Sequence, residues 1–390
     1  MAFFKRTGSS FTTRNTVRLI NSGAEYFDLL KDLIQKANQV IHLQTYIFNE
    51  DETGNAVAQV LKEASKRGVQ VYLVVDGYAS QNLSGSFIKE LTDAGVHFRW
   101  FHPLLKSRYF YLGRRLHHKI VTVDGQHGVI GGINISNLYN NTANNLPWLD
   151  FALYIEGEAL TEIKSICERR AVQSTLGLKK INVKHSQVVS NFKGNCMVGV
   201  RVNDWVLRKK EITDCYAKML RKASSDVIIM SPYFIPDHKF MRSLNAVARR
   251  GVRIRLILAG DSDVLLSKYA ERYVYHSLFK KNIEIYEYQK NVLHGKMAVC
   301  DKEWVTVGSY NINRISTYAS IELNVEVKDI PLATEVRKIM ESIISADCEL
   351  ITKEGYSSTN FFKRLLYFCS YTIFRVMFFL FTFYYRQREQ

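Results

Sequence analysis

The chain has 390 residues, of which 47% are hydrophobic and 23% are charged. These proportions are ordinary for a globular protein and exclude disordered and fibrous classes, and the length suits two or three domains or one large bilobal unit. The 53 lysines and arginines exceed the 37 acidic residues, which gives a net charge of +16. That excess predicts an anionic partner: nucleic acid, an anionic membrane face or a phosphorylated small substrate.

The predicted elements alternate between helix and strand along both halves of the chain. Apolar residues at helical spacing precede a β-branched run, and a second helix ends at a basic turn with a glycine that leads into another such run. This alternation predicts an α/β lobe that is present twice. The helix, strand, turn and strand fall at 26–34, 40–48, 66–68 and 69–75 in the first half, and at 216–220, 227–234, 249–251 and 252–258 in the second. We expect a first lobe at 15–165, an inter-lobe segment at 166–200, a second lobe at 201–355 and an aromatic tail at 356–390.

The two halves share a motif in one register. The residues at 117–134 and 294–311 follow the same HxKxxxxD-x6-GxxN spacing, and every matched position is 177 residues from its counterpart. One such motif is a moderate signal, but two in register without a gap indicate a duplicated functional site. The recurring residues are His117, Lys119, Asp124, Gly131 and Asn134 in the first copy, and His294, Lys296, Asp301, Gly308 and Asn311 in the second.

The residue types in this motif suit phosphate chemistry. Positions i and i+2 of a strand project from the same face, so His117 and Lys119 are expected to face one substrate, as are His294 and Lys296. A lysine supplies positive charge to phosphoryl oxygens, and an imidazole can attack phosphorus or donate a proton. The alternative for a single motif is a buried structural histidine and a turn aspartate, which the paired copies disfavour.

These paired motifs resemble the HKD motifs of the phospholipase D superfamily, over about residues 15–350. Further segments are similar to bacterial cardiolipin synthases, although Asn311-Ile312-Asn313 and Arg314-Ile315-Ser316 depart from the usual pattern after the second motif. The departures leave the phosphodiester chemistry intact and make the acceptor less certain. The similar segments are Gly131 to Ile135, Trp148 to Asp150, Ile155 to Gly157, Ser231 to Asp237 and Gly308 to Asn311.

The resemblance implies two tandem α/β lobes, related by a pseudo-two-fold axis, that bring both histidines to one phosphate. His117 would be the nucleophile that forms a phosphohistidine, and His294 would be the acid and base. Asp124 and Asp301 belong to the motif, but we expect them to fix the loop after each strand. No metal or cofactor is implied. Lys119, Lys296, Asn134, Asn311 and Ser309 would hold phosphoryl oxygens, and Asp150 and Glu322 would orient the imidazoles, with Glu326 as a rival to Glu322.

Two stretches combine basic and aromatic residues. Residues 95–120 contain six lysines or arginines and no acid, and they lead into the first HKD motif, so we expect this run to receive an anionic substrate. The tail holds 13 of the 44 phenylalanines and tyrosines, and 365–385 carries only Arg375 as a charge. This stretch is long enough to cross a bilayer, but its central arginine makes an interfacial helix equally credible. Packing of the tail on the protein is the less favoured alternative.

The cysteines and the N-terminal residues indicate the cellular compartment. The six cysteines include no CxxC pair, since the closest two, Cys196 and Cys215, are 19 positions apart, and we expect reduced, mostly buried thiols. The first seven residues lack the apolar stretch of a secretory signal. We expect a membrane-associated protein on the cytoplasmic side of the inner membrane, with a membrane surface and an anionic phospholipid as partners and nucleic acid disfavoured.

The function implied is phosphatidyl transfer by a cardiolipin synthase-like enzyme, from phosphatidylglycerol to a second phosphatidylglycerol with release of glycerol. The alternatives are a phospholipase D-type hydrolase, a nuclease of the same superfamily, and a non-catalytic module that binds anionic lipids. The sequence leaves the acceptor alcohol and the oligomeric state open.

Overall fold

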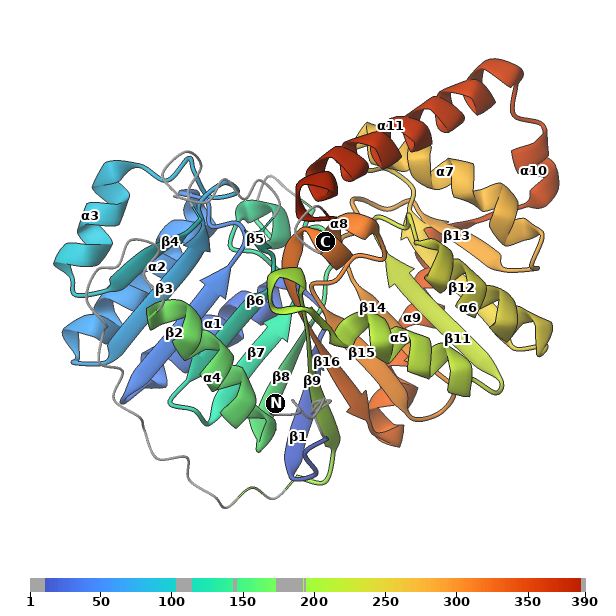
Figure 1. The fold of residues 1–390 in the computed structure, drawn as a ribbon. Coiled ribbons are helices and arrows are strands. Elements are labelled where there is room, and N and C mark those ends of the chain that lie inside the picture. Colours follow the sequence, from blue (N-terminus) through green and yellow to red (C-terminus); the bar gives the residue numbers. More distant parts are fainter. Residues whose placement is uncertain (1–10, 103–113, 143–145, 173–191, 193, 387–390) are drawn as a thin grey trace, which may run out of the picture.

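The computed structural model describes residues 11–102, 114–142, 146–172, 192 and 194–386, with side chains through Met377. Two mixed β-sheets, one in each half of the chain, lie side by side as two lobes (Figure 1). The first sheet has the order β1-β8-β7-β6-β2-β3-β4. Its strands are β1 (Asn15–Ile20), β2 (Val40–Thr45), β3 (Gln70–Asp76), β4 (His97–Phe101), β6 (Lys119–Val123), β7 (His127–Gly131) and β8 (Ala152–Gly157).

The second sheet repeats this order strand for strand, as β9-β16-β15-β14-β11-β12-β13, with β10 and β17 added at its two edges. The α/β fold with two tandem lobes is therefore confirmed. A short strand of the first half, β5 (Arg115–Leu116), pairs in parallel with β16 and so links the lobes. The strands are β9 (Met197–Asp204), β10 (Lys209–Lys210), β11 (Asp226–Ser231), β12 (Arg253–Ala259), β13 (Glu284–Tyr288), β14 (Met297–Cys300), β15 (Trp304–Gly308), β16 (Ser320–Lys328) and β17 (Cys348–Ile351).

Helices cover both faces of each sheet. Apolar side chains of α1, α2 and α3 pack on one face of the first sheet, and those of α5, α6 and α7 pack on the matching face of the second. The other faces share a single core with α4 and α9, so the lobes are joined by buried apolar contact. The helices are α1 (Gly23–Lys36), α2 (Glu52–Lys66), α3 (Gly85–Asp93), α4 (Ala159–Val172), α5 (Glu211–Lys222), α6 (His238–Arg249), α7 (Leu265–Phe279), α8 (Arg314–Tyr318), α9 (Ile330–Asp347), α10 (Lys353–Ser357) and α11 (Phe361–Arg386), with 3-10 turns at Asn137–Tyr139 and Trp205–Leu207.

Local sequence signals explain where these helices end. Gly68 follows α2 with φ +92 and Gly251 follows α6 with φ +80, a conformation that glycine adopts without strain. Four of the six cysteines are buried, and all six are free thiols. The expected inter-lobe segment 166–200 includes the end of α4 and the start of β9, while 173–191 and 193 lie outside the described residues.

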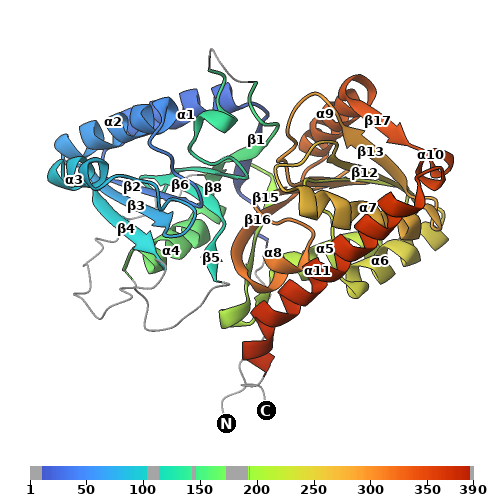
Figure 2. The same ribbon diagram turned by 90° about the horizontal axis from the view of Figure 1, so that it is seen from above.

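The C-terminal helix α11 lies along α7 on the second lobe (Figure 2). Tyr367 is buried in this contact, and the Tyr371 ring stacks 4.7 Å from the Tyr273 ring. The opposite face leaves Phe361 and Phe362 more than 70% exposed. The tail therefore packs on the protein through one face, which the sequence disfavoured, and keeps a second apolar face outside. Among the helices described, none combines the length and the apolar character that crossing a membrane requires.

Candidate active site

Both motif histidines line one cavity of about 460 Å³. The main chain brings them there from opposite lobes in the same way. The His117 amide donates to the Ile321 carbonyl oxygen of the second lobe, and the His294 amide donates to the Leu149 carbonyl oxygen of the first. The cavity is lined by Tyr46, Ile47, Arg115, His117, Asn134, Tyr139 and Trp148 of the first lobe, and by Tyr233, Asp263, Val264, Ser267, His294, Asn311, Asn313, Ile315, Ser316, Ala319, Ser320 and Phe374 of the second.

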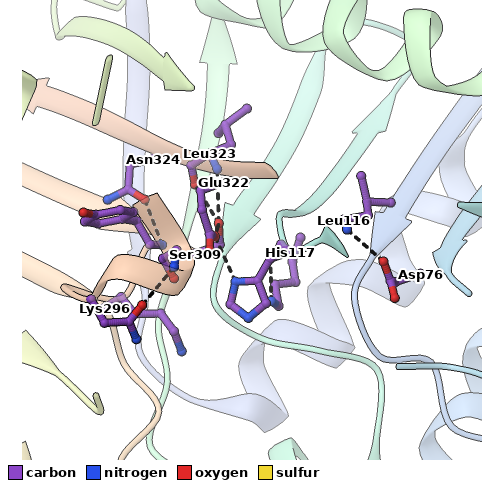
Figure 3. A network of polar contacts seen from close by, with 12 residues as sticks. Asp76, Leu116, His117, Lys296, Ser309, Glu322, Leu323 and Asn324 are labelled. Atoms are coloured by element: carbon purple, nitrogen blue, oxygen red, sulfur yellow. Dashed lines mark hydrogen bonds and ion pairs between the residues drawn. The ribbon is translucent and has the colours of Figure 1, made fainter. Parts of the chain in front are cut away.

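Each histidine is held by a carboxylate of the opposite lobe. His117 Nδ1 lies 2.8 Å from Glu322 Oε2, and His294 Nδ1 lies 2.5 Å from Asp150 Oδ2. Figure 3 shows the Glu322 side chain reaching His117. An acceptor at Nδ1 fixes the proton on that nitrogen and leaves Nε2 of each ring to react. The structure thus separates Glu322 from its rival, because Glu326 instead accepts a 2.5 Å bond from Arg201.

Burial is the main influence on the protonation of the two imidazoles. It lowers the pKa of His117 despite the opposing charge of Glu322, and it lowers the pKa of His294 well below the usual value, with Lys296 acting in the same direction. Burial also raises the pKa of Asp150 to about 6, although Lys296 opposes that shift. The lowered pKa favours the neutral form of both rings, which is the form that a nucleophilic imidazole needs.

The two lysines lie beside the histidines and are fully buried. Lys119 Nζ donates to the His117 carbonyl oxygen at 2.6 Å, and Lys296 Nζ donates to the His294 carbonyl oxygen and lies 2.7 Å from His294 Nδ1. Burial lowers the pKa of Lys119 to about 7 and that of Lys296 to about 8. A phosphate anion in the cavity would favour the charged form of both lysines, because an opposite charge nearby offsets the cost of desolvation.

The remaining predicted phosphate ligands are placed differently from one another. Asn311 lines the cavity, and its buried Oδ1 has no hydrogen-bond partner among the described residues. Asn134 is committed to the protein, since Oδ1 accepts from the Ile47 amide at 3.1 Å and Nδ2 donates to the Tyr139 hydroxyl at 2.8 Å. The buried Ser309 hydroxyl donates to Glu322 at 2.5 Å, so in this structure Ser309 supports the carboxylate that holds His117.

The two motif aspartates lie at the far end of their strands. Asp124 accepts three bonds from the main-chain amides of residues 38–40, and Asp301 accepts from the amides of residues 224–226. Both residues have positive φ, at 54 and 50. Each aspartate thus fastens the turn after its strand to the loop before the neighbouring strand, which is the loop-fixing role that the sequence suggested.

The described arginines of the basic run before the first motif mostly form ion pairs or hydrogen bonds with other parts of the protein. Arg114 forms an ion pair of 2.8 Å with Asp204 of the second lobe, and Arg99 donates to the Arg170 carbonyl oxygen at 2.7 Å. Arg115 is the one described arginine of the run that lines the cavity, and it also contacts Asp76 at 3.4 Å. Residues 103–113 of the run lie outside the described residues.

Tyrosines near the histidines were missed as site residues. The Tyr139 hydroxyl lies 3.4 Å from His294 Nε2, and the Tyr46 ring contacts the His117 ring with centroids 4.8 Å apart. Tyr46 and Tyr233 occupy matching places in the upstream repeat, so the duplication held a signal for them. Tyr139 lies in an irregular turn that the periodicity of the sequence does not predict.

Comparison with known proteins identifies the family of this chain. The family model described as "Cardiolipin synthase, PLD-like domain" matches residues 30–150 and 216–344, which include both motifs. The chain belongs to this family. Cardiolipin synthase B of Escherichia coli (strain K12) is 33% identical over 347 residues, with 88% of this chain and 83% of that protein covered. Cardiolipin synthase 2 of Bacillus anthracis is 30% identical over 346 residues, covering 85% of this chain and 64% of that protein.

Solved structures extend the agreement to the fold. Phosphatidylserine synthase of Haemophilus influenzae Rd KW20 superposes with a TM-score of 0.73, covers 95% of both chains and is 12% identical. A polyphosphate kinase of Porphyromonas gingivalis superposes with a TM-score of 0.60 over 87% of this chain and 49% of that one, at 14% identity. At such low identity these similarities concern the fold alone.

Proposed function

We propose that the protein is a phosphatidyltransferase of the cardiolipin synthase type, which converts two molecules of phosphatidylglycerol to cardiolipin and glycerol. The observation that carries this proposal is the pair of histidines from opposite lobes in one cavity, each held by a carboxylate of the other lobe. The similarity to cardiolipin synthases over 88% of the chain supports the choice of substrate.

The first half of the reaction forms a phosphohistidine. Nε2 of His117 attacks the phosphorus of the donor, the bond from phosphorus to the headgroup oxygen breaks, and His294 gives a proton to the departing glycerol. Burial lowers the pKa of His294, and the negative charge of the phosphodiester opposes this shift, so substrate binding favours the protonated ring. Glu322 keeps the His117 proton on Nδ1 and stabilises the positive charge that the ring acquires.

The second half transfers the phosphatidyl group. The hydroxyl of the acceptor lipid gives its proton to His294 and attacks phosphorus, and the bond between phosphorus and His117 breaks. Asn311, which lines the cavity, supplies hydrogen bonds for the phosphoryl oxygens in both halves, and the buried Lys119 and Lys296 beside the histidines supply positive charge. Water in place of the lipid hydroxyl would give phosphatidic acid, so the occupant of the acceptor position decides between transferase and hydrolase.

We further propose that α11 rests on an anionic membrane through its outer face. The helix presents Phe361 and Phe362 to the outside, and Arg375 and Val376 lie further along it and are also exposed. An apolar face with basic residues suits the interface of a bilayer that contains anionic lipids. Phe374 of the same helix lines the active-site cavity, so this placement brings the cavity to the lipid surface. The cytoplasmic face of the inner membrane is the expected location.

The enzymatic proposal is tested by incubating the purified protein with phosphatidylglycerol vesicles and analysing lipids and glycerol by mass spectrometry. Cardiolipin and glycerol in equal amounts are expected from the wild type, and neither from His117→Ala. Phosphatidic acid as the sole lipid product would establish a hydrolase instead. Cleavage of DNA at a rate that falls steeply with salt, with no lipid product, would indicate a nuclease.

The membrane proposal is tested by flotation with vesicles that contain phosphatidylglycerol. Replacing Phe361 and Phe362 together by serine should reduce the bound fraction severalfold, because apolar area is lost from the interface. Ile330→Ser is the matched control, since Ile330 is 60% exposed but begins α9. Equal binding of the double variant and the control would contradict a docking role for α11.

A further inference from the structure

The active-site cavity is asymmetric although the catalytic residues are repeated. Among the described residues that line it, one lysine or arginine comes from the first lobe, Arg115, and one aspartate or glutamate from the second, Asp263. Neither is repeated: Arg115 precedes His117 by two residues, whereas Val292 precedes His294 by two. Asp263 follows β12 by four residues, and the residue four after β3 is Ser80, which is buried and donates to the Tyr46 carbonyl oxygen.

Asp263 is held in place by Tyr233, the second-lobe counterpart of Tyr46. The Tyr233 hydroxyl donates to Asp263 Oδ1 at 2.5 Å, and both residues line the cavity. No ion pair to Asp263 forms within the described parts of the chain, whereas Arg115 is paired with Asp76. The second carboxylate oxygen of Asp263 accepts no hydrogen bond from a described residue, so a ligand in the cavity can take that position.

Asp263 and His294 both line the cavity from the second lobe. Burial lowers the pKa of Lys296, and Asp263 is among the carboxylates that oppose this shift, together with Asp150 and Glu322. Asp263 also adds to the raised pKa of Tyr139, which results chiefly from burial, and the Tyr139 hydroxyl is the group 3.4 Å from His294 Nε2. His294 is the residue that exchanges a proton with the alcohol in the proposed reaction.

The chemistry of the substrate limits what such a carboxylate can contact. A phosphodiester is an anion, so the carboxylate repels its oxygens and cannot belong to the phosphate position. A carboxylate is an acceptor of hydrogen bonds, and hydroxyl groups are its natural neutral donors. In phosphatidylglycerol the hydroxyls belong to the headgroup alcohol, which is the part that leaves in the first half-reaction and attacks in the second.

We propose that Asp263, oriented by Tyr233, forms a subsite that binds the glycerol hydroxyls of the headgroup alcohol beside His294. This inference rests on the proposed phosphatidyl transfer and adds where the alcohol binds. The subsite holds the acceptor lipid by its glycerol and so favours its hydroxyl over water at the phosphohistidine. The subsite also distinguishes the two lobes of the duplicated site, because it places the headgroup alcohol beside the second lobe.

The test compares Asp263→Asn with Asp261→Asn, a nearby exposed aspartate that does not line the cavity. Each protein is given phosphatidylglycerol vesicles, and cardiolipin and phosphatidic acid are measured together. In Asp263→Asn the ratio of cardiolipin to phosphatidic acid should fall about tenfold, the effect of one charge-assisted hydrogen bond. Asp261→Asn should keep the wild-type ratio.

Tyr233→Phe provides a second variant that changes the subsite without removing the carboxylate. It should shift the ratio in the same direction by a smaller factor, because Asp263 remains but is less well oriented. Added free glycerol should compete with the acceptor lipid in the wild type and much less in Asp263→Asn.

Three results would overturn the subsite. Provided that the wild type is active, the first is a ratio of cardiolipin to phosphatidic acid that stays unchanged in Asp263→Asn and Tyr233→Phe, including the case in which both products fall equally. A defect confined to lipids with an ammonium headgroup, tested with phosphatidylethanolamine vesicles, would show that the carboxylate binds a cation instead of hydroxyls. A wild-type protein that forms neither product would overturn the proposed function, and the subsite with it.

Discussion

The two lobes share a catalytic frame but differ in what surrounds it. In both lobes, the main-chain amide of the histidine donates to a carbonyl oxygen of the other lobe, and the imidazole contacts a carboxylate of that same lobe. The supports differ: Glu322 is held by the Ser309 hydroxyl, whereas Asp150 accepts from the Phe151 amide and lies 3.9 Å from Lys296. The second lobe alone carries Asp263 in the cavity and α11 along its outer helix.

This difference matches the chemistry of phosphatidyl transfer. A nucleophile and a proton donor make unlike demands on their surroundings, although both are imidazoles in the proposed reaction. Duplication supplies two histidines with the same geometry, and later differences around them can separate their roles. Because each carboxylate comes from the opposite lobe, neither lobe holds a complete catalytic unit.

The largest effect expected is from removing either histidine, and a substrate with an activated leaving group should separate the two. His117→Ala should lower turnover by roughly 10³-fold or more with any substrate, because the nucleophile is lost. His294→Ala should lose as much with phosphatidylglycerol but far less with a nitrophenyl phosphodiester, whose leaving group needs no proton. Intact-mass analysis should show a phosphatidyl adduct in His294→Ala. An adduct in His117→Ala instead would reverse the roles of the two lobes.

Replacing the carboxylates that contact the histidines from the opposite lobes, Glu322 and Asp150, should give the next largest effects. Glu322→Gln and Asp150→Asn should each lower turnover by roughly 10²-fold or more, because the imidazole loses its fixed proton and orientation. Glu322→Gln should resemble His117→Ala and lose the adduct, while Asp150→Asn should resemble His294→Ala. Circular dichroism checks that the variants fold. Adduct formation in Glu322→Gln at the wild-type rate would contradict the role of Glu322 in supporting His117 as the nucleophile.

A smaller effect concerns the charge of Lys119. Its pKa of about 7 means that it is mostly protonated below pH 7 and mostly neutral above. The charged form binds a phosphate anion more tightly, so KM for phosphatidylglycerol should rise about tenfold as the pH is raised from 6 to 9. Lys119→Arg stays charged over this range, so its KM should rise less, and chiefly above pH 8, where Lys296 loses its proton. An equally steep rise in Lys119→Arg would assign the titration to another group.

The smallest effect on catalysis is expected from the motif aspartates. Asp124→Ala and Asp301→Ala should each lower the free energy of unfolding by about 2 kcal/mol, because main-chain amides lose their acceptor. Asp301 should cost more, since it also accepts from the Ser224 and Ser225 hydroxyls. Turnover below the melting temperature should stay within about twofold of wild type. A large fall in kcat without loss of stability would place these residues in the chemistry after all.

The sequence was most informative where local pattern and duplication coincide. Gly68 and Gly251 follow the ends of helices as expected. The strands that carry the motifs begin at Lys119 and Met297, so His117, His294 and Lys296 precede the strands on which the sequence placed them. The run at 95–120 was interpreted less well, because Arg99 and Arg114 are satisfied by partners more than 70 residues away. The tail could not be placed either, since its contact with α7 depends on side chains of two distant helices.

By itself, then, the sequence determined that the protein has two like lobes and predicted that two histidines and two lysines carry its chemistry, because repeated spacing is a property of the chain alone. Only the tertiary structure decided that Glu322 and not Glu326 holds His117, and that each carboxylate serves the opposite lobe. It also decided that Asp263 faces the cavity while its counterpart Ser80 is buried. These facts arise from packing between distant segments, and a hydrogen bond of about 3 Å depends on positions that sequence spacing does not specify.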